Sequence, residues 1–370
     1  MKDLLLRISE RLMRSPAAPY HEELVASEVI AICRELELSC KPDSFGNLIL
    51  SAAKRPAKAP IVLAAHMDHP GFRIHRQISP TQFAADFLGG VGDSYFKPGT
   101  LLRLMPGNIP ASLSKRIDAD KRTFEIQAAS NPSAPPRFAV WDLPEFSSDN
   151  NRITGRVCDD LIGCATILTV LATLRGSPSA ANVIGALTRA EEVGFHGALA
   201  LAQSRRLSKK SLVISLETSR EMPPVQMGNG VIIRVGDRAS TFDSASTRFL
   251  AEVASDLGKA NPHFKFQRAL MSGGTCEATA YQEYGFRCAA VCVALGNYHN
   301  CGANDLIQPE FVASDDAVSM AELLVECARH WTRSDSFASR LPKRLERLSR
   351  EALRELKKRP IQLPEAEVLR

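Results

Sequence analysis

The chain of 370 residues lacks the features that mark several large protein classes. It contains no run of about eighteen apolar residues, which a membrane-spanning helix needs. Its first fifteen residues, MKDLLLRISERLMRS, carry charges throughout their apolar spacing, so they predict an amphipathic helix instead of a signal peptide. We therefore expect neither secretion nor a membrane partner.

Two further absences limit the partners and the compartment. The formal net charge is only +5, and no dense Lys/Arg block with interleaved aromatic residues precedes the C-terminal tail, so we expect no nucleic-acid partner. The nine cysteines are odd in number and include no CxxC pair, which argues against a zinc ribbon or a redox motif. A reducing cytoplasmic location fits this cysteine usage best.

The apolar pattern that is present predicts an α/β protein. Residues 1–38 show helical periodicity and precede two short strand-like runs, GNLILSA and APIVLAAH. From residue 155 onward helical and strand-like segments alternate, as in LIGCATILTVLATLR followed by NVIGALTRA. This order predicts a mostly parallel, mixed sheet sandwiched by helices.

Two segments depart from the α/β rhythm. Residues 70–154 consist of short strand-like runs separated by Gly, Pro, Ser and Asp, so they predict an inserted β subdomain within an α/β domain of residues 1–69 and 155–333. Residues 334–370 predict a basic helical extension, because leucines recur at helical spacing in RLPKRLERLSREALRELKKRP. We expect this helix to pack on the body, with a membrane or an acidic partner as the alternative.

Side chains that commonly bind metals follow several of the predicted strands. In an open α/β sheet, ligands bind beyond the carboxyl ends of the strands, so these side chains are expected to converge. They are His66 ending APIVLAAH and Asp68 two residues later, Asp159 and Asp160 in VCDD, Glu191 and Glu192 after NVIGALTRA, Glu217 ending SLVISLE, and His299 after RCAAVCVALGNY.

Each of these features alone has an ordinary structural explanation. A histidine after a buried strand is more often a hydrogen-bonded core residue, and an Asp pair before a helix is usually an N-cap. The adjacent Glu191 and Glu192 are harder to explain, because two buried carboxylates cost several kcal/mol unless cations or hydrogen bonds compensate them. A metal ion would supply that compensation.

The adjacent glutamates predict a division of roles. Neighbouring side chains on an extended segment point to opposite sides, so one of the two is expected to bind a metal and the other to accept a proton from water. Two imidazoles and three carboxylates exceed the needs of one catalytic zinc ion, but they suit two ions that share a carboxylate. Asp68 would then orient His66.

The chain resembles the co-catalytic dinuclear zinc exopeptidases, and most closely the tetrahedral aminopeptidase family, which includes glutamyl aminopeptidases and proteins once called cellulase M. The resemblance spans about residues 5–333 and rests on six motifs in matching order. They are AHMDHPGF, VCDDLIG, RAEEVGFHGA, VISLETS, SGGTCEATAYQEYG and GNYHNCG.

The resemblance implies a fold, an activity and a role for each residue. The inserted segment is expected to be a small β-barrel-like subdomain, and the chain is expected to be an aminopeptidase that acts on peptides and forms a homo-oligomer, from a dimer to twelve subunits. The resemblance also implies that Asp159 bridges two metals, with His66 and Glu217 holding one metal and Glu192 and His299 the other. It further implies that Glu191 is the general base and that the peptide bond before Asp160 is cis. Gly273, Gly274 and Thr275 correspond to a loop that approaches the substrate, although a tight turn is the simpler explanation of the two glycines. Zinc is the expected metal, with cobalt or manganese as alternatives.

The chain departs from the family pattern at four positions, which are His69, Leu161, Glu217 and Cys276. These departures suggest that the metals are retained but that the substrate pocket is altered. They leave open two other functions, a dinuclear amidohydrolase of N-acyl amino acids or small amides, and an inactive relative that serves as a binding or assembly subunit. A glycosidase is disfavoured, because its carboxylate pair would need no imidazole ligands.

Overall fold

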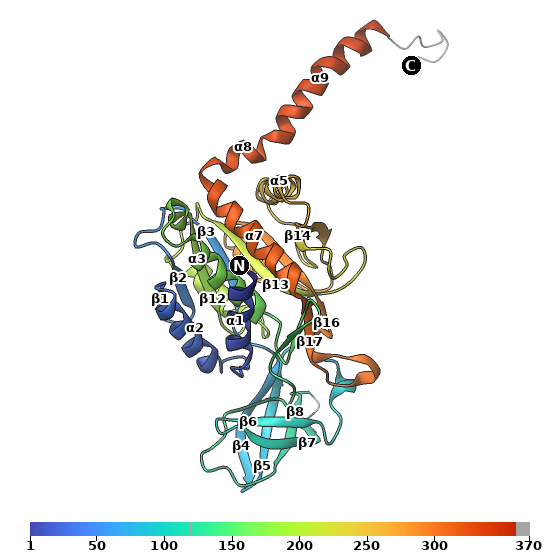
Figure 1. The fold of residues 1–370 in the computed structure, drawn as a ribbon. Coiled ribbons are helices and arrows are strands. Elements are labelled where there is room, and N and C mark those ends of the chain that lie inside the picture. The colour runs from blue at the N-terminus through green and yellow to red at the C-terminus, as the bar shows by residue number, and fades with distance from the viewer. Residues whose placement is uncertain (119, 360–370) are drawn as a thin grey trace, which may run out of the picture.

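The structure, a computed structural model, describes residues 1–118 and 120–359. It consists of an α/β body with a smaller β-barrel at one end, while the C-terminal helix projects from the opposite end (Figure 1). The α-helices are α1 (Lys2–Met13), α2 (Glu23–Glu35), α3 (Leu161–Leu174), α4 (His196–Gln203), α5 (Ser244–Ala260), α6 (Glu277–Glu283), α7 (Ser314–His330), α8 (Ser334–Ala338) and α9 (Arg340–Lys358).

The body is built on one mixed sheet of eleven strands. Neighbouring strands follow the order β1-β2-β12-β3-β13-β16-β17-β11-β10, with β14 beside β16 and β15 beside β14. The strands are β1 (Ser39–Pro42), β2 (Leu48–Ser51), β3 (Ile61–His66), β10 (Ser147–Asp149), β11 (Arg152–Gly155), β12 (Val183–Thr188), β13 (Leu212–Arg220), β14 (Val231–Gly236), β15 (Phe266–Leu270), β16 (Arg287–Gly296) and β17 (Glu310–Ala313).

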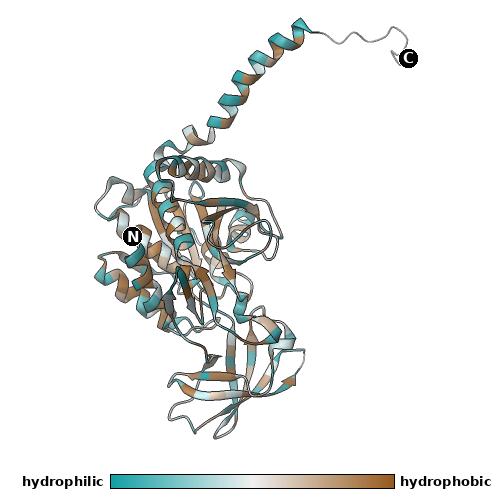
Figure 2. Ribbon diagram, turned by 45° about the vertical axis from the view of Figure 1, so that its right-hand side comes forward, coloured by the Kyte–Doolittle hydropathy of each residue, from teal (hydrophilic) through white to brown (hydrophobic). Residues whose placement is uncertain are grey.

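Helices cover both faces of this sheet, because side chains of the central strands alternate between two cores. On β3, Ile61, Leu63 and Ala65 join the core under α1, α3 and α7, while Val62 and Ala64 join a core shared with α4 and α6. Helix α3 is apolar almost all round and is nearly completely buried. Figure 2 shows the apolar colour concentrated on these inner strands and helices. The predicted fold class is therefore confirmed.

The barrel closes through the strand order β4-β5-β8-β7-β6-β9. Its strands are β4 (Gly71–Ser79), β5 (Gln82–Leu88), β6 (Leu101–Met105), β7 (Ile109–Asp118), β8 (Thr123–Ala128) and β9 (Phe138–Trp141). Aromatic side chains such as Phe72, Phe124 and Trp141 fill its interior. Strand β10 and all but the last residue of β11 lie within the predicted insertion of residues 70–154, yet both strands pair in the main sheet.

The parallel strands place one end of the sheet next to the barrel. Strands β12, β3, β13 and β16 run parallel to one another, so their carboxyl ends lie along the same edge. This edge is where the metal-binding side chains are expected to gather.

Helix α9 is basic, amphipathic and exposed. Residues 340–359 contain nine Lys or Arg against three Glu, and Leu345 and Leu348 belong to an apolar stripe that is 53% and 44% exposed, respectively. No residue of α9 is buried, so the expectation that it packs on the body is wrong. Its first residue, Arg340, forms ion pairs with Glu252 and Asp256 of α5. Residues 360–370, the end of the predicted extension, lie outside the described residues.

No described helix combines the length and the apolar character that crossing a membrane requires.

The contrast between α3 and α9 can be tested by unfolding. Replacing both Leu345 and Leu348 by Ser should change the free energy of unfolding by less than about 0.5 kcal/mol, because neither side chain is buried. Leu168→Ala in α3 should lower it by about 2–5 kcal/mol, because a cavity remains in the core. Denaturant titrations of both variants measure these changes, and a large loss in the α9 variant would show that the helix packs on the folded body.

Candidate metal centre and active site

Three neighbouring parallel strands deliver most of the predicted metal ligands to one edge of the sheet. His66 is the last residue of β3, and Glu217 lies near the end of β13. Glu191 and Glu192 follow β12, which pairs with β3 on its other side. The sheet topology alone thus brings four acidic or imidazole groups from distant parts of the chain together.

The remaining predicted ligands come from loops at the same edge. Asp159 precedes α3, where Asp160 caps the helix by accepting a hydrogen bond of 3.1 Å from the amide of Gly163. A Cβ atom at Gly163 would lie 2.2 Å from Asp160 Oδ2, so only glycine allows this close cap. The peptide between Asp159 and Asp160 is cis, as the resemblance implied. His299 lies in a left-handed backbone conformation just after β16.

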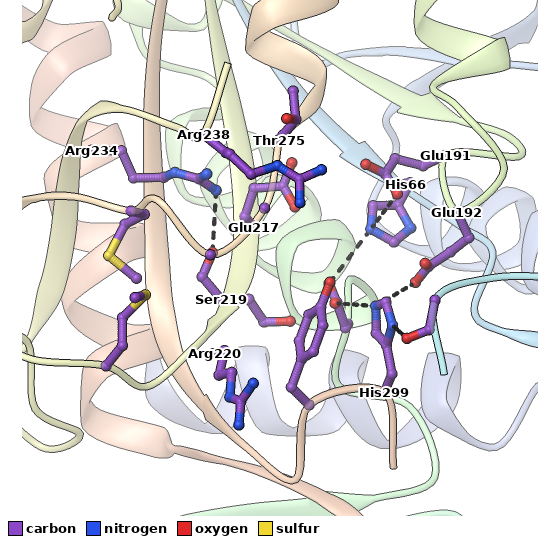
Figure 3. A pocket seen from close by; sticks show the side chains of 18 of the residues that line it. His66, Glu191, Glu192, Glu217, Ser219, Arg220, Arg234, Arg238, Thr275 and His299 are labelled. Atoms are coloured by element: carbon purple, nitrogen blue, oxygen red, sulfur yellow. Dashed lines mark hydrogen bonds and ion pairs between the residues drawn. The ribbon is translucent and has the colours of Figure 1, made fainter. Parts of the chain in front are cut away.

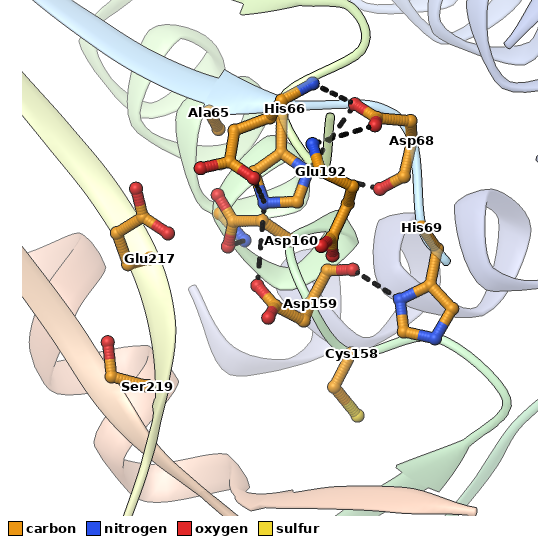
Figure 4. Close-up of polar contacts among 12 residues, drawn as sticks. Ala65, His66, Asp68, His69, Cys158, Asp159, Asp160, Glu192, Glu217 and Ser219 are labelled. Carbon is orange, nitrogen blue, oxygen red and sulfur yellow. Dashed lines mark hydrogen bonds and ion pairs between the residues drawn. The ribbon is translucent and has the colours of Figure 1, made fainter. Parts of the chain in front are cut away.

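Asp159 is the centre of the cluster (Figure 4). Its Oδ1 lies 3.5 Å from His66 Nε2. Its Oδ2 lies 3.6 Å from His299 Nε2. Three sets of potential ligand atoms lie within 4.8 Å of one another. They are His66 with Asp159 and Glu217, Asp159 with Glu192 and His299, and His66 with Glu191 and Glu192.

The hydrogen bonds of the two histidines leave their Nε2 atoms facing carboxylates. His66 Nδ1 donates to the carbonyl of Asp68 at 3.0 Å, and His299 Nδ1 donates to the carbonyl of Gly90 at 2.8 Å. In neutral imidazoles the Nε2 atoms are then unprotonated and point at carboxylate oxygens. Asp159 Oδ1, one of these oxygens, is buried and accepts no hydrogen bond within residues 1–118 and 120–359. Opposed lone pairs of this kind fit a divalent cation between them.

The pKa values of the cluster show how strongly it attracts positive charge. Burial lowers the pKa of His66, but the charges of Glu191, Asp159 and Asp68 outweigh burial and raise it well above the usual range. Burial raises the pKa of Glu217 to about 7. Burial and the neighbouring carboxylates likewise raise the pKa of Glu191 well above its ordinary value. Bound cations would relieve this shared excess of negative charge.

The structure corrects the expected geometry of the adjacent glutamates. Glu191 and Glu192 lie in a turn after β12, and not on an extended segment. Both carboxylates therefore face the same cavity, but they have different neighbours. Glu192 Oε1 lies 3.2 Å from His299 Nε2, whereas Glu191 Oε2 lies 4.0 Å from His66 Nε2.

Two buried carboxylates hold the loops that carry the cluster. Asp68 accepts the amides of Glu191 and Glu192 at 2.9 and 3.2 Å, so its carboxylate positions that turn, while its backbone carbonyl orients His66. Glu310, which the sequence reasoning missed, accepts the amide of Asp159 at 3.0 Å and that of His299 at 2.8 Å. Only the folded chain brings Glu310 next to these residues, so no sequence signal pointed to it.

The departures from the family pattern lie mainly behind the cluster. His69 contacts the carbonyl of Asp159 at 2.9 Å and Oδ1 of Asn300 at 3.0 Å, and it does not line the active-site cavity. Leu161 and Cys276 are also buried and do not line it. The expectation that these positions alter the substrate pocket is therefore wrong for all three, and among the four departures only Glu217 lines the cavity.

The cluster forms one wall of a cavity of about 700 Å³, and arginines form another (Figure 3). Arg234 is 3% exposed and donates to Ser219 Oγ at 3.2 Å. Arg220 and Arg238 also line the cavity, and neither side chain has a hydrogen-bonded or ion-pair partner in the described part of the chain. Sequence reasoning missed these arginines, because isolated basic residues are common on surfaces.

The predicted substrate loop reaches the same cavity. Gly273, Gly274 and Thr275 line it just before α6, and the carbonyl of Gly274 accepts the amide of Arg238 at 3.0 Å. Neither glycine has a positive φ, so a strained turn does not explain their presence.

Comparison with known proteins identifies the family. The family model described as M42 glutamyl aminopeptidase matches residues 117–307, which is about half of the chain. The chain belongs to this M42 family. It is accordingly a metal-dependent aminopeptidase, as predicted. The glutamyl aminopeptidase of Lactococcus lactis is 24% identical over 279 residues, covering 67% of this chain and 76% of that protein.

Solved structures share the fold of this M42 chain at low sequence identity. TET1 peptidase of Pyrococcus horikoshii matches with a TM-score of 0.72 at 20% identity, covering 88% of this chain and 99% of that one. A TET aminopeptidase from a marine-sediment thaumarchaeon matches with a TM-score of 0.75 at 18% identity, covering 90% and 99% of the two chains.

The role of Glu310 predicts an effect on metal binding without direct ligation. Glu310→Gln should weaken metal affinity by about 10- to 100-fold, because an amide cannot accept the hydrogen bonds of both loops with its two terminal atoms. Competition with a chromogenic chelator measures the affinity, and the exposed Glu283→Gln serves as the control. Unchanged affinity in Glu310→Gln would contradict this positioning role.

Proposed function

We propose that this M42 aminopeptidase binds two divalent metal ions, most simply zinc. Asp159 would be shared, His66 and Glu217 would hold one ion, and Glu192 and His299 the other. The observation that carries the proposal is the pair of buried imidazoles whose Nε2 atoms face buried carboxylate oxygens. Histidine and carboxylate ligands would also accept cobalt or manganese. When bound, such ions polarise a carbonyl group and lower the pKa of water.

Glu191 is proposed as the general base. Its carboxylate borders the cavity, lies next to the cluster and has a pKa raised by burial and neighbouring negative charge, all of which suit a group that accepts and returns a proton. It would take a proton from the attacking water and pass it to the amine that leaves. The amide of Glu191 is fixed by Asp68, so the base is held in place by its own backbone.

The arginines indicate the class of peptide. Arg220, Arg234 and Arg238 line the cavity beside the cluster, and a negatively charged side chain at the peptide's N-terminus would pair with them. The family description and the Lactococcus relative, a glutamyl aminopeptidase, support the same substrate class. The proposed reaction is therefore the release of an acidic N-terminal residue from a peptide.

An assembly and a compartment complete the proposal. A homo-oligomer is supported by TET1 of P. horikoshii, which is described as assembling into a tetrahedron or an octahedral shell, and a solution mass near that of one chain would contradict it. A reducing, cytoplasmic compartment is supported by the nine cysteines, which are all free. Finding them paired in the protein isolated from its cell would argue against it.

The role of Glu191 can be separated from metal binding. Glu191→Gln should lower kcat/KM on a glutamyl anilide by about 10²–10⁴-fold, because the amide cannot accept the proton. Elemental analysis of zinc-loaded protein should still find two ions per chain, since Glu191 is not a proposed ligand. The exposed Glu283→Gln is the control. Near-normal hydrolysis in Glu191→Gln would remove its proposed role, and absence of tightly bound metal from the unmodified chain would contradict the metal site.

The arginine wall predicts a change in substrate preference. Arg238→Gln should lower kcat/KM on a glutamyl anilide by about 10- to 150-fold relative to a leucyl anilide, because a charge-assisted hydrogen bond contributes about 1.5–3 kcal/mol. The leucyl substrate controls for damage to the metal centre. An unchanged ratio in both Arg238→Gln and Arg220→Gln would refute the acidic specificity, and hydrolysis of N-acyl amino acids alone would favour the amidohydrolase hypothesis.

A further inference from the structure

A second cavity, of about 570 Å³, opens at the other end of the parallel strands. Pro60, which lines it, immediately precedes β3, and Ser211 immediately precedes β13. His66 and Glu217 lie near the opposite ends of these same two strands, and the two cavities have no lining residue in common. A ligand in this second cavity would therefore not compete directly with the peptide substrate.

Among the residues that the structure describes, those lining the second cavity include basic side chains and no acidic ones. Five cationic side chains line it, and no Asp or Glu is among its lining residues. None of the five forms a side-chain hydrogen bond or an ion pair with any residue in the described ranges. They are Lys41 on β1, Lys54 and Lys58 between β2 and β3, and Arg205 and Arg206 after α4.

This charge arrangement favours a multiply charged anion. Unpaired cations around one concavity repel one another, and a ligand with several negative charges would relieve that repulsion. Arg side chains match phosphate oxygens with paired donors, and Lys side chains add point charges. A single carboxylate would leave most of the five cations unpaired, so a ligand with two or more phosphate groups is the better match.

The floor of the cavity can bind more than phosphate. Ile184 and Leu207 are buried there, and Ile49 lies beside them, so an apolar or planar group could pack on this surface. Ser211 is fully buried, and its hydroxyl has no hydrogen-bond partner in the part of the chain that the structure describes. A volume of about 570 Å³ also falls in the range of small-molecule sites, which is larger than pyrophosphate needs.

We propose that the second cavity binds an organic polyphosphate of nucleoside di- or triphosphate type. The phosphate groups would lie among the five cationic side chains, and the organic group would lie on Ile184 and Leu207. The buried hydroxyl of Ser211 would donate to the ligand. This site is separate from the metal centre and does not depend on the proposed peptidase mechanism.

Calorimetric titration of the full-length, metal-loaded protein at about 0.15 M salt tests the site, because screening at this salt suppresses weak surface binding. ATP should bind most tightly, pyrophosphate more weakly, and adenosine without phosphate should show no binding. This order separates an organic polyphosphate from a purely inorganic one. Equal affinity for ATP and pyrophosphate would refute the organic part, and no ATP binding would refute the whole proposal.

Matched variants place the binding in the cavity. Lys41→Gln combined with Arg206→Gln should weaken ATP binding at least tenfold. Lys54→Gln combined with Lys58→Gln, in the segment between β2 and β3, should weaken it by a similar factor. Both pairs are exposed, so thermal unfolding and hydrolysis of a glutamyl anilide should stay unchanged. Lys343→Gln combined with Arg347→Gln on α9 removes the same charge elsewhere and should leave affinity unchanged. Equal losses in the α9 control, or full affinity in both cavity variants, would overturn the proposal.

Discussion

The architecture around the metal centre depends on one electrostatic constraint, which is that many carboxylates are buried together at the end of the sheet. Asp68, Asp159, Asp160 and Glu217 are all buried, and Glu191 and Glu192 border the same cavity. Such a cluster is unfavourable unless cations or hydrogen-bond donors offset it. Backbone amides supply some of these donors, while Asp159 Oδ1 and Glu192 Oε1 are buried without a hydrogen-bond partner in the described part of the chain.

The fold meets this constraint with backbone amides as well as side chains. Asp68 uses its carboxylate to hold the turn of Glu191 and Glu192, and Glu310 ties the Asp159 loop to the His299 loop. These two acids neutralise part of their own desolvation cost by accepting amides. At the same time they fix the distances among the proposed ligands, so positioning and charge compensation come from the same contacts.

The two ends of the parallel strands have opposite electrostatic character. At the carboxyl ends, the acidic cluster stands opposite an arginine wall within one cavity. At the amino ends, Lys and Arg side chains surround a second cavity, and within the described residues they have no acidic partner there. The barrel contributes directly to the first cavity, because Gly90 accepts a hydrogen bond from His299. The insertion is therefore part of the active-site architecture.

The sequence by itself determined the features that depend on local patterns. The apolar alternation after Gly155 predicted the α/β sheet, and the strand ends pointed to His66, Glu217 and the Glu191–Glu192 pair. Parallel strands share one carboxyl edge, so these residues could be expected to meet before any contact was known. The break in rhythm after Pro70 likewise predicted the β insertion.

Only the tertiary structure decided the features that depend on long-range contacts. Glu310 and the three arginines carry no local signature, and they gain meaning only because β17, β13 and β14 bring them beside the cluster. The turn that directs both Glu191 and Glu192 into one cavity is set by the carboxylate of Asp68, more than a hundred residues away. The exposure of α9 was also undetermined, because an amphipathic pattern specifies an apolar face but not what covers it.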